Sequence, residues 1–141
     1  MARQALKIEK PLYGYSKIIN KLKIEEYQFD NLISLAIPLS SERKCRLNFK
    51  KSLGASMPDI EKSIITKSGV LGFRIGLDSL FVCSSTNFSF SRKTVPLLKQ
   101  AFYITDQTGG WCGIRVEGEK VIEMLERICP LNLSIKVFAI G

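Results

Sequence analysis

The last forty residues of the chain carry its clearest pattern, and that pattern constrains the fold more than any other feature. Over 112–117, apolar residues alternate with Gly, Arg and Glu, as in a strand with one covered face. Residues 102–110 read as a preceding strand and the turn of a hairpin. Gly118 then opens a helix that Pro130 stops. Its apolar stripe consists of Val121, Ile122, Leu125, Ile128 and Cys129. A last apolar strand over 137–140 completes the expected order of strand, strand, helix, strand.

Shorter apolar runs upstream predict a further strand and a helix. The run over 32–37 ends at Pro38, which closes a strand because proline lacks an amide donor. One of the two serines that follow can cap a helix over about 42–53, with Gly54 as its stop. Its apolar face consists of Cys45, Phe49 and Leu53. The alternation of Cys45, Leu47 and Phe49 leaves a strand open as the other interpretation.

The middle of the chain predicts a hairpin and a second helix. Period-two alternation on both sides of a Gly-Leu-Asp-Ser turn indicates a hairpin over 71–83. Residues 84–92 are rich in Ser, Asn and Thr and read as a surface loop. Thr94 can cap a helix that runs to about 102, since Pro96 then falls in its first turn, where no amide donor is missed.

These elements fit an α+β fold of antiparallel strands. With 141 residues, the chain suits one hydrophobic core, which we expect over 31–141. Residues 1–30 are rich in Lys and Ile and weakly patterned, so they read as a basic arm or irregular lead-in. Within them, an apolar set recurs at helical spacing: Tyr15, Ile18, Ile19 and Leu22.

The chain contains no histidine. This excludes Ser-His-Asp and Cys-His nucleophilic sites, imidazole metal ligands and histidine proton shuttles. Asp106 beside Thr108 could suggest proton transfer, but turn chemistry explains the pair more simply. The Asp side chain can accept a hydrogen bond from the backbone two residues on, with Gly109 and Gly110 supplying left-handed torsions. An enzyme is still possible, but it would have to work with carboxylates, lysines or a bound cofactor. We expect no catalytic residue and no metal site in this chain.

Four cysteines lie far apart in the sequence, without a Cys-x-x-Cys pair. Such spacing predicts neither a zinc knuckle nor a redox motif, so we expect reduced, mostly buried thiols. No apolar run is long enough for a membrane span, and the N-terminus lacks the apolar stretch of a signal peptide. These features predict a soluble, cytoplasmic protein.

Three stretches in order along the chain resemble the gamma subunit of heterotetrameric sarcosine oxidase. They are Leu53–Pro58, Leu71–Phe81 and Tyr103–Leu133, the last beginning YITDQTGGW and closing CPLNL. Asn132 stands where the family has aspartate, and the chain stops where family members continue through further strands. The resemblance implies a partial, C-terminally short version of a fold related to the folate-binding aminomethyltransferase of glycine cleavage.

The resemblance also implies a function. The family's complex oxidatively demethylates sarcosine to glycine, releases hydrogen peroxide and can pass the one-carbon unit to tetrahydrofolate. Its alpha and beta subunits hold FAD, FMN and NAD, and its delta subunit holds zinc. By this resemblance the present chain holds no cofactor and works as a non-catalytic gamma subunit. Its partners are the alpha, beta and delta subunits, with alpha in direct contact.

Basic residues and one tryptophan are the candidate partner interface. The formal net charge is +8, and residues 1–51 hold 11 basic and 5 acidic side chains. The interface candidates are Arg43, Lys44, Arg46, Lys50, Lys51 and Trp111. The cluster could instead contact phosphates in a nucleic-acid-binding module, although no recognised motif accompanies it. A stand-alone folate-binding, aminomethyltransferase-like protein, with Trp111 stacked on a pterin, is the remaining alternative.

Overall fold

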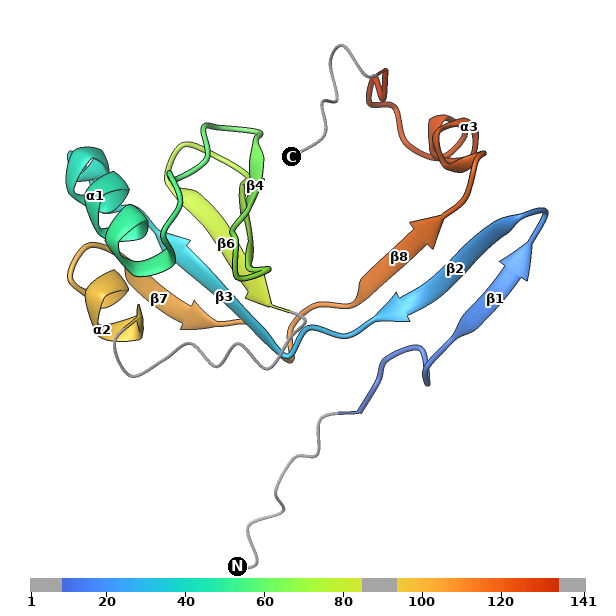
Figure 1. Cartoon of the computed structure of the whole chain (residues 1–141), viewed down its shortest axis with the longest axis horizontal. Helices are drawn as coiled ribbons and strands as arrows, with labels where there is room; N and C mark the ends of the chain where they lie inside the picture. The colour runs from blue at the N-terminus through green and yellow to red at the C-terminus, as the bar shows by residue number, and fades with distance from the viewer. Residues whose placement is uncertain (1–8, 85–93, 135–141) are drawn as a thin grey trace, which may run out of the picture. The chain divides into compact units, whose positions relative to one another are not determined.

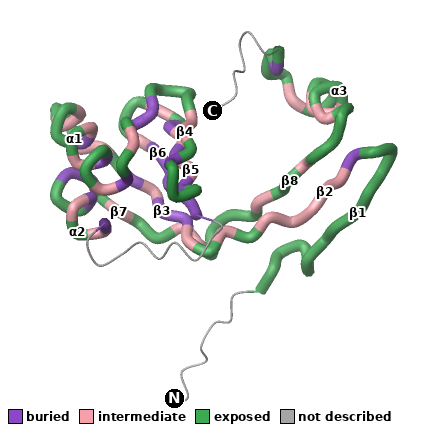
Figure 2. Tube along the Cα trace, viewed as in Figure 1, coloured by how far each residue is buried: buried purple, intermediate pink, exposed green. Residues whose placement is uncertain are grey.

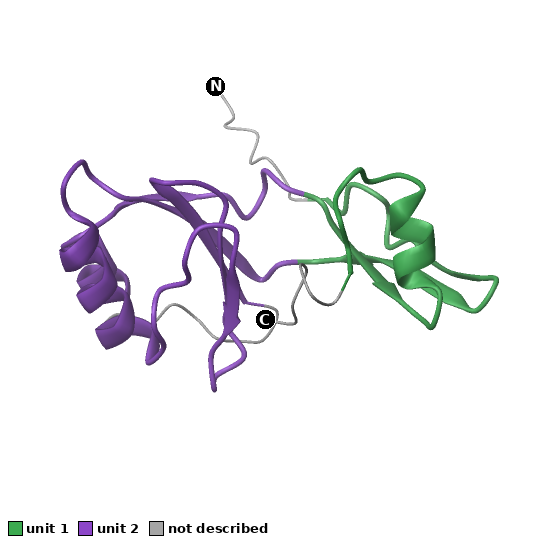
Figure 3. Ribbon diagram, turned by 90° about the horizontal axis from the view of Figure 1, so that it is seen from above, with its two compact units in different colours: residues 1–28, 112–140 green, residues 29–111, 141 purple. Residues whose placement is uncertain are grey.

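The computed structural model describes residues 9–84 and 94–134. It consists of antiparallel sheets with few helices, which confirms the expected α+β class. The chain divides into two compact units (Figure 3). Among the described residues, unit 1 combines 9–28 with 112–134, and unit 2 takes 29–84 and 94–111. The N-terminal stretch and the C-terminal stretch therefore build one unit together.

Unit 2 is built on a five-stranded antiparallel sheet with the strand order β4-β5-β6-β3-β7. Its strands are β3 (Asn31–Ala36), β4 (Ser63–Ile65), β5 (Leu71–Arg74), β6 (Ser79–Ser84) and β7 (Tyr103–Asp106). The predicted strand before Pro38 is β3, and the predicted hairpin is β5 and β6, which pair antiparallel. Both predictions are confirmed.

Two helices, α1 (Glu42–Leu53) and α2 (Thr94–Lys99), cover one face of this sheet (Figure 1). The expected helix after Pro38 is confirmed as α1. Gly54 ends it in the left-handed conformation, at φ 71°, and donates its amide to the Lys50 carbonyl. Ser41 precedes α1 without a side-chain cap, and α2 stops at Lys99, earlier than the sequence suggested.

The two faces of the five-stranded sheet are covered unequally. Under the helices lies the main core, which combines sheet residues with one side of α1: Ile33, Leu35, Leu80, Val82, Cys45, Phe49 and Leu53. Successive strand residues point to opposite faces. Leu32, Phe81 and Cys83 therefore form a smaller cluster on the face away from α1. Buried residues concentrate in β3, β6 and the inner side of α1 (Figure 2).

Unit 1 contradicts the expected arm over 1–30. Within it, β1 (Ser16–Ile19) and β2 (Leu22–Tyr27) form a hairpin, and β2 pairs with β8 (Gly113–Glu117). Asn20 and Lys21 between the first two strands both have positive φ, at 49° and 67°, as a two-residue hairpin turn requires. Of the apolar residues at helical spacing, Ile18, Ile19 and Leu22 are strand residues instead. In β2, Leu22 and Ile24 alternate with charged residues at period two.

The C-terminal pattern is also assembled differently from the expectation. β7 pairs with β3 in unit 2, whereas β8 pairs with β2 in unit 1, so the predicted hairpin over 102–117 is wrong. The helix is a single short one, α3 (Val121–Glu126), and Ile122 and Ile128 of its supposed buried stripe are exposed. The expected last strand over 137–140 lies outside the described residues.

Gly118, in the connection between β8 and α3, allows this connection to pass close to the turn between β1 and β2. Its φ is 140°, and a Cβ at this position would lie 2.5 Å from the Lys21 carbonyl oxygen. Only glycine allows this approach without moving the backbone. Gly118 is therefore not the start of the helix, as the sequence suggested. It lies before α3, where the chain passes close to Lys21.

Candidate partner interface

The five basic residues of the predicted cluster all lie on α1, but they do not all belong to the same surface of the helix. Cys45, Phe49 and Leu53 face the core, so Arg43, Lys44, Lys50 and Lys51 stand on the opposite, exposed side. Across the described part of the chain, none of these four side chains makes an ion pair. We call these four residues, together with Leu47, the outer face of α1.

Leu47 is the centre of this outer face and was missed as a site residue in the sequence. Its side chain is 55% exposed. Arg43 and Lys44 precede it by four and three positions, and Lys50 and Lys51 follow it by three and four. Residues three and four apart are neighbours on a helix surface, so all four cations adjoin Leu47. The spacing alone contained this signal once a helix was assumed.

Arg46, the fifth predicted cation, does not belong to the outer face. Its Nε donates to Glu42 Oε1 at 3.0 Å, and one terminal nitrogen donates to Asp59 Oδ1 at 2.9 Å. The other terminal nitrogen donates to the Met57 carbonyl at 3.3 Å. Arg46 therefore ties α1 to the segment that follows it, and its charge is neutralised within the chain.

Glu42 links this arrangement to the sheet through Arg74. The Arg74 side chain is only 2% exposed and donates to both Glu42 carboxylate oxygens, at 2.9 and 3.2 Å. It also donates to the carbonyls of Gly76 and Leu77. The hydrogen bonds from Arg74, aided by Arg46, lower the pKa of Glu42 from 4.5 to about 2. The first turn of α1 is thus anchored to β5.

Trp111 belongs to a different surface. Its ring meets Phe81 edge-on, at 5.3 Å between centroids and 76° between planes, and Phe81 stacks on Phe73 at 5.5 Å. Phe81 lies on the face of the sheet away from α1. Trp111 is 55% exposed, so it is a half-covered anchor on that face. The predicted interface residues therefore occupy opposite sides of the sheet and do not form one site.

The Asp106–Thr108 pair is a turn. The Thr108 amide and hydroxyl both donate to Asp106 Oδ1, at 2.9 and 2.7 Å, and these bonds lower the pKa of Asp106. The Leu32 amide donates to the Thr108 hydroxyl at 3.1 Å, which attaches the turn to β3. Gly109 and Gly110 do not adopt the left-handed torsions expected of them, because neither has positive φ.

The cysteines divide into two pairs of different exposure. Cys45 and Cys83 are buried, and burial raises the pKa of both thiols, that of Cys83 to about 11. Cys112 is exposed and Cys129 is half-buried, so only two of the four match the expectation of buried thiols. Among the described residues, no group of three or more Cys, Asp and Glu side chains is placed to hold a metal ion.

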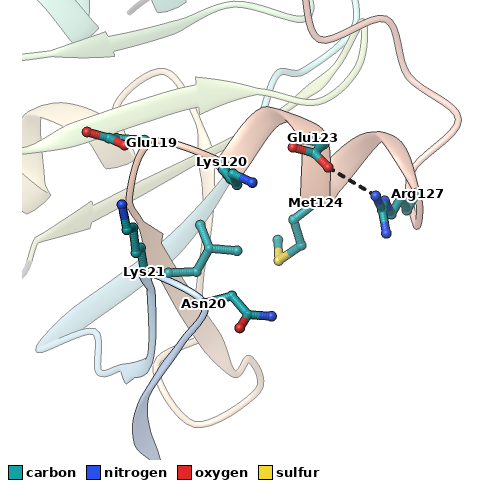
Figure 4. Close-up of a pocket in the computed structure, with 8 residues that line it drawn as sticks. Asn20, Lys21, Glu119, Lys120, Glu123, Met124 and Arg127 are labelled. Atoms are coloured by element: carbon teal, nitrogen blue, oxygen red, sulfur yellow. Dashed lines mark hydrogen bonds and ion pairs between the residues drawn. The ribbon is translucent and has the colours of Figure 1, made fainter.

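Unit 1 contains an open pocket of about 570 Å³ (Figure 4). Its lining consists of Asn20, Lys21, Leu22, Glu119, Lys120, Glu123, Met124 and Arg127. Arg127 is held by Glu123 at 3.0 Å. Leu22 and Met124 provide apolar surface, and the remaining charges are of mixed sign. This lining holds no hydroxyl, thiol or imidazole, so lysine amines and glutamate carboxylates are its reactive side chains.

Unit 1 also carries a charged sheet surface, which differs from the outer face of α1. On β2, Lys23 contacts Glu25 at 2.6 Å, and on β8, Arg115 contacts Glu117 at 2.6 Å. The register places Lys23 opposite Glu117 and Glu25 opposite Arg115. Each charge therefore has an opposite charge both along its strand and across it. We call these four residues the charge ladder.

No helix in the described part of the chain is long and apolar enough to cross a bilayer. No family model and no curated protein matches the chain. A solved structure has a similar fold, the heterotetrameric sarcosine oxidase from Corynebacterium sp. U-96 in complex with pyrrole 2-carboxylate. The TM-score is 0.69 at 18% sequence identity. The match covers 84% of this chain and 61% of that one, so the chain spans less than two thirds of its neighbour. At this identity, the likeness shows a sarcosine-oxidase-related fold.

Proposed function

We propose that this chain is an accessory subunit, of the gamma type, in a heterotetrameric sarcosine oxidase. The observation that carries the proposal is the likeness in fold to a chain of such an enzyme, at a TM-score of 0.69 over 84% of this chain. The three stretches that resemble the gamma subunit support the same assignment from the sequence. The chain contributes contact surface to the assembly, and the reacting groups belong to its partners.

The chemistry of the described side chains favours a subunit that provides contact surface over one that provides reacting groups. The carboxylate that first suggested proton transfer, Asp106, is committed to a turn by two hydrogen bonds from Thr108. The thiols of Cys45 and Cys83 are buried with raised pKa, which suppresses the reactive thiolate. In contrast, two surfaces suit contact with another protein: the outer face of α1 and the aromatic cluster around Trp111.

Under this proposal, the assembly oxidises sarcosine to glycine and passes the one-carbon unit to tetrahydrofolate. The partner subunits hold FAD, FMN, NAD and zinc, and the alpha subunit is the direct contact of this chain. The protein works in the cytoplasm, where such an assembly meets its substrate.

Co-expression tests the proposal. Expressed alone, the chain should self-associate or precipitate, because the half-covered aromatic surface around Trp111 remains without a partner. Co-expression with the alpha and beta subunits of the same organism should keep it soluble and yield a yellow complex. A well-behaved monomer of high thermal stability that leaves the flavin subunits uncaptured would overturn the proposal.

Nucleic-acid binding is the second candidate. It is favoured by the four cations of α1 that form no ion pair with any other described residue. The test is binding to a generic duplex oligonucleotide at increasing salt concentration. Phosphate contacts would weaken steeply with salt, as counterion release requires.

A further inference from the structure

We propose that the outer face of α1 docks on an acidic surface of the partner subunit, with Leu47 inserted into an apolar depression at its centre. This inference rests on the proposed function and names the surface through which that function is exercised. The partner chemistry follows from the face itself: four cations that form no ion pair among the described residues surround one exposed apolar side chain.

The spacing of the face defines the shape that it fits. Arg43 and Lys44 stand one turn before Leu47, and Lys50 and Lys51 one turn after it. Arg43 lies seven positions before Lys50, and Lys44 seven before Lys51. The two pairs are therefore about 10 Å apart along the helix axis. The matching surface therefore presents carboxylates in two groups about 10 Å apart, with an apolar site between them.

The chain leaves these cations available. Arg46 lies four residues before Lys50. Leu47 lies four residues after Arg43 and four residues before Lys51. No acid therefore stands where a helical ion pair would form. Arg46 on the same helix shows the alternative, because Glu42 and Asp59 neutralise it.

The helix presents this face rigidly. Cys45, Phe49 and Leu53 fix its inner side in the main core. The Arg74–Glu42 contact fixes its first turn to β5, and Gly54 closes its last turn. A preorganised surface loses little conformational freedom on binding, which favours affinity.

Leu47 decides between a protein partner and a nucleic acid. Interfaces between proteins combine an apolar anchor with a polar rim that excludes water. A phosphate backbone gains nothing from a leucine that is 55% exposed at the centre of the contact. The face therefore fits an acidic protein surface better than a polyanion.

The experiment compares two double variants in the co-expressed complex. Lys44→Glu/Lys51→Glu changes the outer face, whereas Lys10→Glu/Lys67→Glu changes two exposed lysines elsewhere by the same net charge. The retained fraction of flavin subunits and the dissociation constant are measured at several salt concentrations. We expect the α1 variant to bind at least about tenfold more weakly, and the control to stay within about twofold. Leu47→Ser should weaken binding as well, with little change in salt dependence.

The outcomes separate the inference from the function on which it rests. If the wild-type chain does not bind the flavin subunits, the proposed function fails, and this inference fails with it. If the wild type binds and Lys44→Glu/Lys51→Glu binds equally well, the inference alone is overturned. It is also overturned if that variant assembles normally but loses binding to a duplex oligonucleotide. Circular dichroism of Lys44→Gln/Lys51→Gln, with the same assay, separates loss of contact from loss of folding.

Discussion

The charge ladder of unit 1 and the outer face of α1 in unit 2 each carry four charged side chains, but they use them differently. In the ladder, Lys23 contacts Glu25 and lies opposite Glu117. On α1, by contrast, four like charges surround Leu47 without counter-charges among the described residues. Charge that is neutralised inside the chain stabilises its own sheet. Charge that is left unneutralised on a fixed helix is available to a partner.

The largest loss of stability should come from removing Arg74, which anchors α1 to β5. The contrast between the two charged surfaces depends on this anchor, because the outer face can be presented to a partner only on a fixed helix. Arg74→Met leaves the Gly76 and Leu77 carbonyls without their donor and removes the bidentate contact of Glu42. We expect a loss of about 3 kcal/mol in the free energy of unfolding, measured by urea denaturation. Arg43→Met, on the outer face, is the matched control and should change stability by less than about 0.5 kcal/mol. Similar losses for both variants would contradict the role of Arg74 as the anchor of α1.

Gly118→Ala should destabilise unit 1 next most strongly. The new Cβ would lie 2.5 Å from the Lys21 carbonyl oxygen. The alanine would also have to adopt a φ of 140°, which is unfavourable for a residue with a side chain. We expect a cost of about 2 kcal/mol, seen as faster amide hydrogen exchange in β2 and β8. Gly109→Ala is the control, since nothing lies within 4 Å of its Cβ position. Unchanged exchange in β2 and β8 would show that the close approach at Gly118 does not support the charge ladder.

Acid should weaken the anchor of α1 in a defined range. The folded-state pKa of Glu42 is about 2, below its ordinary value of 4.5, because Arg74 and Arg46 bind the charged form. Its contribution is therefore complete above pH 4.5 and is lost as the pH falls from about 4.5 to about 2. Stability curves of the wild type and Glu42→Gln should converge over this interval. Parallel curves would mean that Glu42 does not contribute in this way.

Reversing one charge of the ladder should have a smaller effect. Lys23→Glu places a third carboxylate beside Glu25 and opposite Glu117. We expect a cost of about 1 kcal/mol in urea denaturation, reduced at high salt. Adding Glu117→Lys restores an opposite pair across the strands and should recover part of the loss. If the second substitution recovers nothing, the four charges do not act as a ladder.

The smallest effect should come from neutralising the outer face itself. Lys44→Gln/Lys51→Gln removes two charges that have no counter-charge among the described residues. The stability of the isolated chain should change by less than about 0.5 kcal/mol, because surface charges of this kind contribute little. Thermal unfolding at low salt measures it. A large loss would show that these lysines have partners within the chain.

The sequence predicted the parts of unit 2 that depend on local pattern. Helical spacing of Cys45, Phe49 and Leu53, with Gly54 after them, predicted α1, although alternation left a strand open there. Alternation on both sides of a turn predicted the β5–β6 hairpin. The resemblance in three stretches also pointed to a sarcosine-oxidase-related fold, which the structural comparison supports.

Unit 1 was mispredicted because its pairing is not local. β2 pairs with β8 across most of the chain length, and no short-range signal reports such a contact. The same reason explains Arg46. Its spacing placed it among the other cations of α1, but Asp59 and Met57, which follow the helix, determine where its side chain lies. Leu47 was overlooked because exposed leucines are common. Only the helix geometry places it at the centre of the outer face of α1.

Covalent labelling of lysines in the native complex tests the central claim most directly. The chain is labelled with an amine-reactive reagent in the assembly purified from cells and, as the second state, in dilute solution immediately after its release from that assembly. Labelling is quantified by mass spectrometry. Lys44, Lys50 and Lys51 should lose most of their labelling in the assembly, while Lys10 and Lys67 keep theirs. Equal labelling of Lys44, Lys50 and Lys51 in both states would contradict the account, because the outer face of α1 would then remain in solvent.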